Sequence, residues 1–153
     1  MMSKDFTASR IALGVVLGLA GASIVYEGVN IAFGGIATLG LQGGTDFFAV
    51  TDANEFAAHD SHVRFLGGVW IGVGAVVAAG AARLERMRSL LHLAFALVML
   101  GGLSRFTAMQ PEVLFGPSLV SPLAAELIGV PMVWLWMART GRSAPMPAGA
   151  ALA

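Results

Sequence analysis

The sequence predicts an all-α integral membrane protein, built as a bundle of four membrane-spanning helices. The first observation is composition: 57% of the 153 residues are hydrophobic and only 12% are charged, with a mean hydropathy of +0.79. An ordinary soluble domain is about half apolar and about one quarter charged. The second observation is that four stretches are long and apolar enough to cross a bilayer, which takes about 20 residues. Their hydrophobicity does not alternate, which argues against a membrane β-barrel.

The first predicted span covers about residues 11–35 and contains one charge, Glu27. Lys4 and Arg10 precede it, and the small residues 20–22 resemble a cleavage site, so the segment also has the outline of a secretory signal peptide. Because the apolar stretch continues well beyond those small residues, we interpret it as a retained span.

The second predicted span covers about residues 65–82 and has no charge. The loop before it, about residues 36–63, is long and acidic. Within it, Asp52 stands three residues before Glu55, a spacing typical of a helix start, and residues 53–63 contain no Pro or Gly. We expect the second helix either to begin early and run into the membrane, or to be preceded by a short amphipathic helix on the membrane surface.

The third predicted span covers about residues 90–109 and holds Arg105 near its end. The fourth covers about residues 118–138 and holds Glu126. Pro131 has no backbone N–H, so it removes a helical hydrogen bond and predicts a bend about one turn from Glu126. Such a bend would widen a cavity beside that acid.

The positive-inside rule predicts the orientation. Seven of the nine basic residues fall on one side of the membrane, and only Arg64 and Arg105 fall on the other. Both termini are therefore expected in the cytoplasm. The four spans form a single domain, residues 1–142, and the tail 143–153, rich in Ala and Pro, is expected to be disordered.

The charged residues inside the predicted spans lie at a similar depth in the membrane. At a rise of about 1.5 Å per residue, Glu27 and Arg105 lie about 24 and 22 Å from the inner boundary, and Glu126 lies about 10 Å below the outer one. Arg64 lies at the outer mouth, near Trp70. A charge in hydrocarbon costs at least about 2.5 kcal/mol and usually pairs inside the protein. We predict one inward-facing cluster, which is either an ionic staple that fixes helix register or a polar pocket for a ligand.

Two GxxxG motifs allow close helix contact: Gly14 with Gly18, and Gly68 with Gly72. We expect them to pack helices within one chain, with dimerisation as the alternative.

Several function classes are excluded. A net charge of zero argues against nucleic-acid binding, and the absence of Cys removes disulfides and thiolate chemistry. Glu55, His59 and His62 share one helical face, which is an incomplete set of metal ligands and is better explained as a wetted surface. No catalytic motif is present, which disfavours an enzyme without excluding one, and we expect no metal and no cofactor.

Three stretches are similar to the domain of unknown function 4345 family, small bacterial membrane proteins in the neighbourhood of DoxX-like proteins. They are residues 60–65 (Asp-Ser-His-Val-Arg-Phe) followed by Gly67-Gly68, residues 101–105 (Gly-Gly-Leu-Ser-Arg), and Pro117 followed by Glu126. The family pattern has an acid where this chain has His62. The resemblance implies a four-helix bundle in the bacterial inner membrane, and it implies that Arg64, Arg105 and Glu126 are typical of the family. It implies no activity.

The function that fits best is binding of a membrane lipid or other hydrophobic small molecule in an outer-leaflet pocket lined by Glu27, Arg64, Arg105, Glu126 and Trp70. The arginines would hold an anionic head group and the acids would accept a donor. The first alternative is an accessory subunit that packs against a larger membrane complex or a second copy of itself. The others are a proton-coupled small transporter and an acid–base isomerase acting through the two acids.

Overall fold

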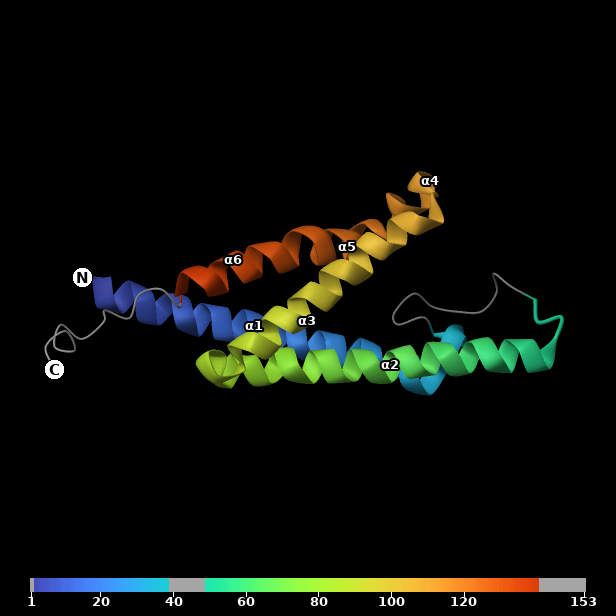
Figure 1. Ribbon diagram of the computed structural model, residues 1–153, viewed down its shortest axis with the longest axis horizontal. Helices are drawn as coiled ribbons and strands as arrows, with labels where there is room; N and C mark the ends of the chain where they lie inside the picture. Colours follow the sequence, from blue (N-terminus) through green and yellow to red (C-terminus); the bar gives the residue numbers. More distant parts are fainter. Residues whose placement is uncertain (1, 39–48, 141–153) are drawn as a thin grey trace, which may run out of the picture.

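The computed structural model describes residues 2–38 and 49–140, in which every regular element is helical (Figure 1). Four helical segments are long and apolar enough to cross a membrane, Thr7–Ala37, Ala53–Ala82, Leu84–Ala108 and Val120–Thr140. The prediction of an all-α membrane fold is confirmed. The elements in chain order are α1 (Met2–Gly34), η1 (Gly35–Ala37), α2 (Ala53–Ala82), α3 (Leu84–Ser104), η2 (Arg105–Ala108), α4 (Pro111–Leu114), α5 (Val120–Ala124), η3 (Ala125–Gly129) and α6 (Val130–Thr140). The predicted tail 143–153 lies outside the described residues.

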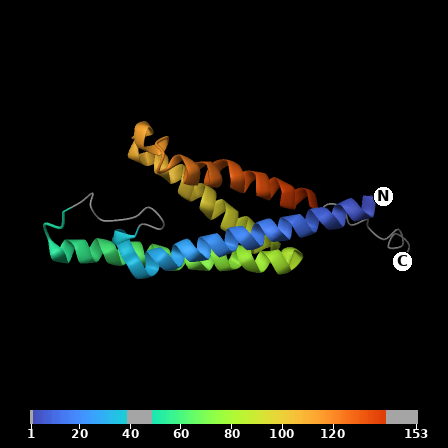
Figure 2. The ribbon, with the colours of Figure 1, turned by 180° about the vertical axis from the view of Figure 1, so that it is seen from behind.

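The helices form two arms. Helices α1 and α2 lie side by side and antiparallel, while α3 and the segment α5–η3–α6 form a second arm that crosses them (Figures 1 and 2). The arms meet near the start of α1 and diverge toward α4. The start of α1 and the end of α6 lie at the same end of the molecule, as four successive crossings require.

Helix α2 begins at the predicted cap. The Asp52 carboxylate Oδ1 accepts hydrogen bonds from the backbone N–H groups of Asn54 (2.9 Å) and Glu55 (3.0 Å), which satisfies two N–H groups that have no partner inside the helix. The helix then continues without a break to Ala82. The early start is therefore confirmed, and the alternative of a separate surface helix is wrong.

A seam of four glycines joins α1 to α2. A Cβ added to Gly21 or Gly67 would lie 2.4 Å from a backbone nitrogen of the opposite helix, and one added to Gly28 or Gly74 would lie 2.7 Å from such a nitrogen. The two glycines on each helix are seven residues apart, which keeps them on one side of a helix. Only glycine permits this approach, because any side chain would collide with the neighbouring backbone.

The GxxxG prediction is correct for one motif and wrong for the other. A Cβ at Gly14 or Gly18 would meet Ala81 of α2 at 3.2 or 3.7 Å, so that motif does pack within the chain. A Cβ at Gly68 or Gly72 would meet nothing within 4 Å. This second motif faces away from the other described helices, because the glycines that contact α1 are at other positions of α2.

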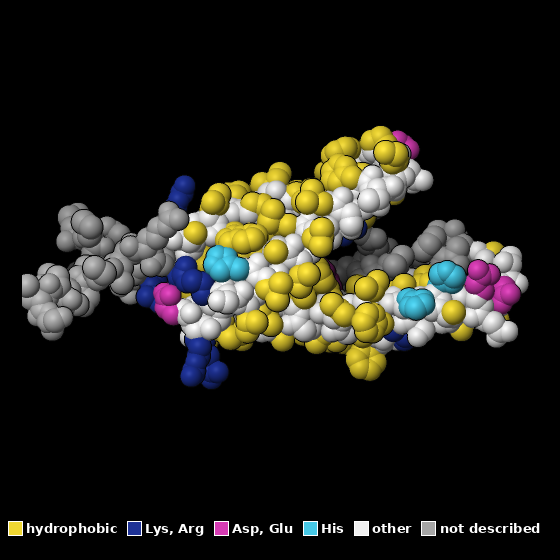
Figure 3. All heavy atoms as spheres, viewed as in Figure 1, with side chains coloured by type: hydrophobic (Ala, Val, Ile, Leu, Met, Phe, Trp, Pro, Cys, Tyr) yellow, Lys and Arg dark blue, Asp and Glu magenta, His cyan; other side chains and the backbone are white. Residues whose placement is uncertain are grey.

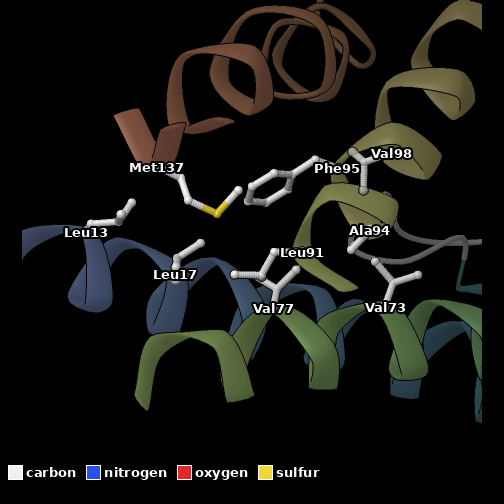
Figure 4. Close-up of a cluster of buried hydrophobic side chains, with 9 residues drawn as sticks. All are labelled: Leu13, Leu17, Val73, Val77, Leu91, Ala94, Phe95, Val98 and Met137. Atoms are coloured by element: carbon white, nitrogen blue, oxygen red, sulfur yellow. The ribbon is translucent and has the colours of Figure 1, made fainter. Parts of the chain in front are cut away.

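The buried core occupies only the half of the molecule where the arms meet. Figure 4 shows nine side chains from both arms that point toward one another, with Met137 of α6 between α1 and Phe95 of α3. Beyond Val73 and Val98, this core ends and the arms separate. Figure 3 shows the described parts of the two arms drawing apart there, and we call the space between them the hollow. The nine residues are Leu13, Leu17, Val73, Val77, Leu91, Ala94, Phe95, Val98 and Met137.

Candidate functional site

An ion pair joins the two helical segments of the second arm in the half toward α4. Arg105 donates from Nε to Oε2 of Glu126 at 2.8 Å and from Nη2 to Oε1 at 2.7 Å, a two-bonded geometry that planar guanidinium and carboxylate groups favour. Glu126 is 9% exposed. Gly102 on α3 makes room for it, since a Cβ there would lie 2.9 Å from the Glu126 Cβ. The structure thus brings these two predicted site residues together.

Glu126 lies in η3, a π-helical turn that spans Ala125–Gly129, directly before Pro131. The backbone N–H of Val130 donates to the Ala125 carbonyl, five residues back. The sequence predicted an irregularity from Pro131 but not its form. Single π turns inside α-helices are uncommon, and those that occur are often found at functional sites. The turn here contains Glu126, which is one of the predicted site residues.

Arg64 lies in the other arm and has a different partner. Its Nε donates to Asp60 Oδ2 at 2.6 Å, one turn earlier on α2, and its Nη1 donates to the carbonyl of Phe33 at the end of α1. The second carboxylate oxygen of Asp60 accepts from the backbone N–H of Ile36 at 2.8 Å. The structure therefore does not bring Arg64 to Glu27 or Glu126, as a single cluster would require.

Glu27 contacts Trp70 rather than an arginine. The indole Nε1 donates to Glu27 Oε2 at 3.4 Å, and Glu27 has no cationic partner among the described residues. Glu27 follows Leu13, Leu17 and Ile24 at helical spacing, so it continues the stripe of α1 that faces the core. Trp70 likewise packs against the core. The pair therefore lies where the core ends and the hollow begins.

The candidate residues occupy two depths. Trp70 lies 12 residues before Ala82, the last residue of α2, which is about 18 Å along the helix from that end. Arg64 lies 18 residues before Ala82, about 27 Å along, and Arg105 lies 21 residues after Leu84, the start of α3, about 31 Å along. Thus Arg105 lies near the rim of the hollow and Glu27 with Trp70 lies near its floor, whereas Arg64, two residues before Leu66, lies about 200° around α2 from the face that borders the hollow.

The hollow also has apolar walls. Leu66 continues the stripe of α2 that carries Trp70, Val73 and Val77 at spacings of three and four residues, and it is 61% exposed. An exposed leucine on the face that would be core in a closed bundle shows that this face lacks a protein partner in the described residues. We define the cleft as the space between the arms bordered by Glu27, Leu66, Trp70 and the Arg105–Glu126 pair.

A second hollow lies elsewhere, on α6. It has a volume of about 530 Å³ and is lined by Gly129, Met132, Val133, Leu135, Trp136 and Arg139. None of these was a predicted site residue. Because all of them come from one helix and its preceding turn, this hollow is a surface groove, unlike the cleft, which has two walls.

The histidine face on α2 does not form a metal centre. His59 Nδ1 lies 2.8 Å from the carbonyl oxygen of Glu55, one turn earlier. Within residues 2–38 and 49–140, the structure gathers no set of three or more potential ligands that could hold a metal ion.

Comparison with known proteins places the chain in one family. The family described as Domain of unknown function (DUF4345) matches residues 12–137, which include all five candidate residues. No curated protein and no solved structure matches the chain.

Proposed function

We propose that this chain, which belongs to the family described as Domain of unknown function (DUF4345), is a non-enzymatic membrane protein of the bacterial inner membrane that binds a lipid or other hydrophobic small molecule. The binding site is the cleft between the two arms. The observation that carries the proposal is that the two arms share a core in one half only and diverge beyond it, beside the Glu27–Trp70 contact and the Arg105–Glu126 pair.

The free-energy cost of placing polar groups in a membrane supports this assignment. Ion pairs and carboxyls inside a membrane are expensive, and a closed apolar bundle would be the simpler way to make four helices stable. Here the outer half instead combines polar groups with exposed apolar walls such as Leu66. Ligand sites share this composition, with mostly apolar linings and a few placed polar groups.

Retention of lipid by the purified protein tests the proposal. We expect native mass spectrometry in mild detergent to show a bound lipid, and Leu66→Trp, which places an indole in the cleft, to lower the lipid-bound fraction at least about tenfold, equivalent to about 1.4 kcal/mol. The matched control is Phe65→Trp, because Phe65 is the preceding residue, is 69% exposed and points about 100° away around the helix. Equal retention by both variants would refute the cleft as the site.

An accessory role in a larger complex is the second candidate. The observation that favours it is the open face of α2, where Cβ atoms at Gly68 and Gly72 would meet nothing within 4 Å. Small residues on a lipid-facing surface let another membrane helix approach closely. A membrane protein that copurifies in mild detergent, in place of lipid, would favour this role over the first.

A further inference from the structure

The charges that border the cleft do not cancel. Arg105 is matched by Glu126 through two hydrogen bonds, and Arg64 is matched by Asp60. Both pairs are therefore neutral as units, and of the two only Arg105–Glu126 borders the cleft. Glu27 remains, and no cation among the described residues faces it. The cleft thus carries one carboxyl in excess, at its floor.

The surroundings of Glu27, which is half-buried, are incomplete for an acid inside a membrane span. A carboxylate can accept about four hydrogen bonds, but in the described residues Glu27 accepts one long bond, 3.4 Å from the Trp70 indole, on Oε2. Its Oε1 has no protein donor among those residues. The opposite wall offers no free cation, because the nearest arginine there is held by Glu126. A bound partner would have to supply the missing positive charge or donors.

We propose that the floor of the cleft binds an ammonium group, with the Glu27 carboxylate as its counter-ion and the Trp70 ring beside it. A carboxylate next to an aromatic ring suits an organic cation, because the ring face attracts positive charge in addition to the ionic attraction. Two classes of molecule carry such a group in a membrane, namely an aminolipid with its head group and a free amphipathic amine. The inference rests on the proposed function and replaces the expectation that the arginines hold an anionic head group.

The neutral Arg105–Glu126 pair explains why an anion is disfavoured. To hold an anionic head group, Arg105 would have to release Glu126, leaving a 9% exposed carboxylate without a cation. Breaking a buried pair in this way costs several kcal/mol. An ammonium group at Glu27 requires no such exchange, so the present arrangement is complementary to a cation.

Fluorescence of Trp70 provides the test. The chain contains three tryptophans, so Trp134→Phe with Trp136→Phe leaves Trp70 as the single reporter. The protein is placed in nanodiscs of phosphatidylglycerol, which has no amine. Three brominated quenchers are titrated: phosphatidylethanolamine and phosphatidylglycerol with brominated chains, and dodecylamine with a terminal bromine.

We expect half-maximal quenching by phosphatidylethanolamine or by the amine at a mole fraction at least about tenfold lower than by phosphatidylglycerol. Glu27→Gln should remove that preference, and Glu55→Gln, which removes an exposed acid from the outer end of α2, should keep it. Preference for phosphatidylethanolamine identifies an aminolipid. Preference for dodecylamine alone identifies a free amine.

Quenching that is saturable but equal for all three probes, and unchanged in Glu27→Gln, would overturn the ammonium site and leave the lipid-binding proposal intact. Failure of the proposed function has a different signature, namely no bound lipid in native mass spectrometry and no saturable quenching by any probe.

Discussion

At the scale of single residues, the ion pair of Arg105 and Glu126 shows how position in the membrane selects partners. Their positions along the predicted spans placed both residues at a similar depth in the membrane, and they form an ion pair in the structure. Depth did not predict the partner of Arg64, because Asp60 was assigned to a loop. The cap at Asp52 already implied that residues 60 and 64 share a helix, where a spacing of four favours an ion pair. The partner of Arg64 was thus available from the sequence, whereas the contact of Glu27 with Trp70 depends on helix pairing.

The Arg105–Glu126 ion pair predicts how a single and a double variant change the free energy of unfolding. Arg105→Met leaves a buried carboxylate without a cation and should lower the free energy of unfolding by about 2–3 kcal/mol, between the ranges of exposed and buried pairs. Combining it with Glu126→Leu removes both charges and should restore most of that loss. Unfolding in mixed detergent micelles, followed by fluorescence, measures both variants.

The control for this pair is Glu85→Gln. Glu85 contacts Arg10 and Arg88 at 3.3 and 3.2 Å with its side chain more than half exposed, so its loss should cost less than about 1 kcal/mol. A double variant that is less stable than Arg105→Met alone would contradict the account.

At the scale of elements, the pairing of α1 with α2 depends on which face of each helix carries its glycines. The sequence contains 20 glycines. Of its two GxxxG motifs, one contacts the neighbouring helix and the other faces outward. Glycines seven residues apart, Gly21 with Gly28 and Gly67 with Gly74, make the closest contacts. Local spacing could not single these out, because every helix surface here carries small residues. Knowledge of the neighbouring helix was required.

Two adjacent glycines on α2 provide a matched comparison. Gly67→Ala places a Cβ 2.4 Å from the Ala32 backbone nitrogen, so the helices must separate, at a cost of about 1–3 kcal/mol. Gly68→Ala places its Cβ in open space and should be neutral or slightly stabilising. Both changes bring the same helix propensity, so the difference between their thermal midpoints isolates the contact. Identical midpoints would show that α1 and α2 are not held by this seam.

At the scale of the whole molecule, the number of spans followed from hydrophobic length, and four were found. The divergence of the two arms could not be predicted in this way, because hydropathy records how apolar a helix is but not which helices it contacts. The same limit explains why one cluster was predicted where the structure has two ion pairs and a separate acid. The predicted orientation rests on the distribution of basic residues and stays a prediction.

The chain has no cysteine, so single introduced thiols can report orientation without background. In right-side-out vesicles, we expect a membrane-impermeant maleimide to label Thr51→Cys and Glu112→Cys directly. Ala82→Cys, at the inner end of α2, should react only after permeabilisation. All three positions are exposed in the chain, and the changes keep every arginine in place. The opposite labelling pattern would place both termini outside.

The contacts of Asp60 and Arg64 have a mechanical consequence. Together they fasten the end of α1 to α2 through the Ile36 N–H and the Phe33 carbonyl, beyond the glycine seam that already joins the two helices. The first arm is therefore joined from the Gly14–Ala81 contact to the Asp60–Ile36 hydrogen bond and should move as one rigid unit. The second arm is tied to it at the core and, beside the core, through Arg10–Glu85 and the Trp136–Ser9 hydrogen bond, so a change in the width of the gap should move the ends of α3 and α5 near α4.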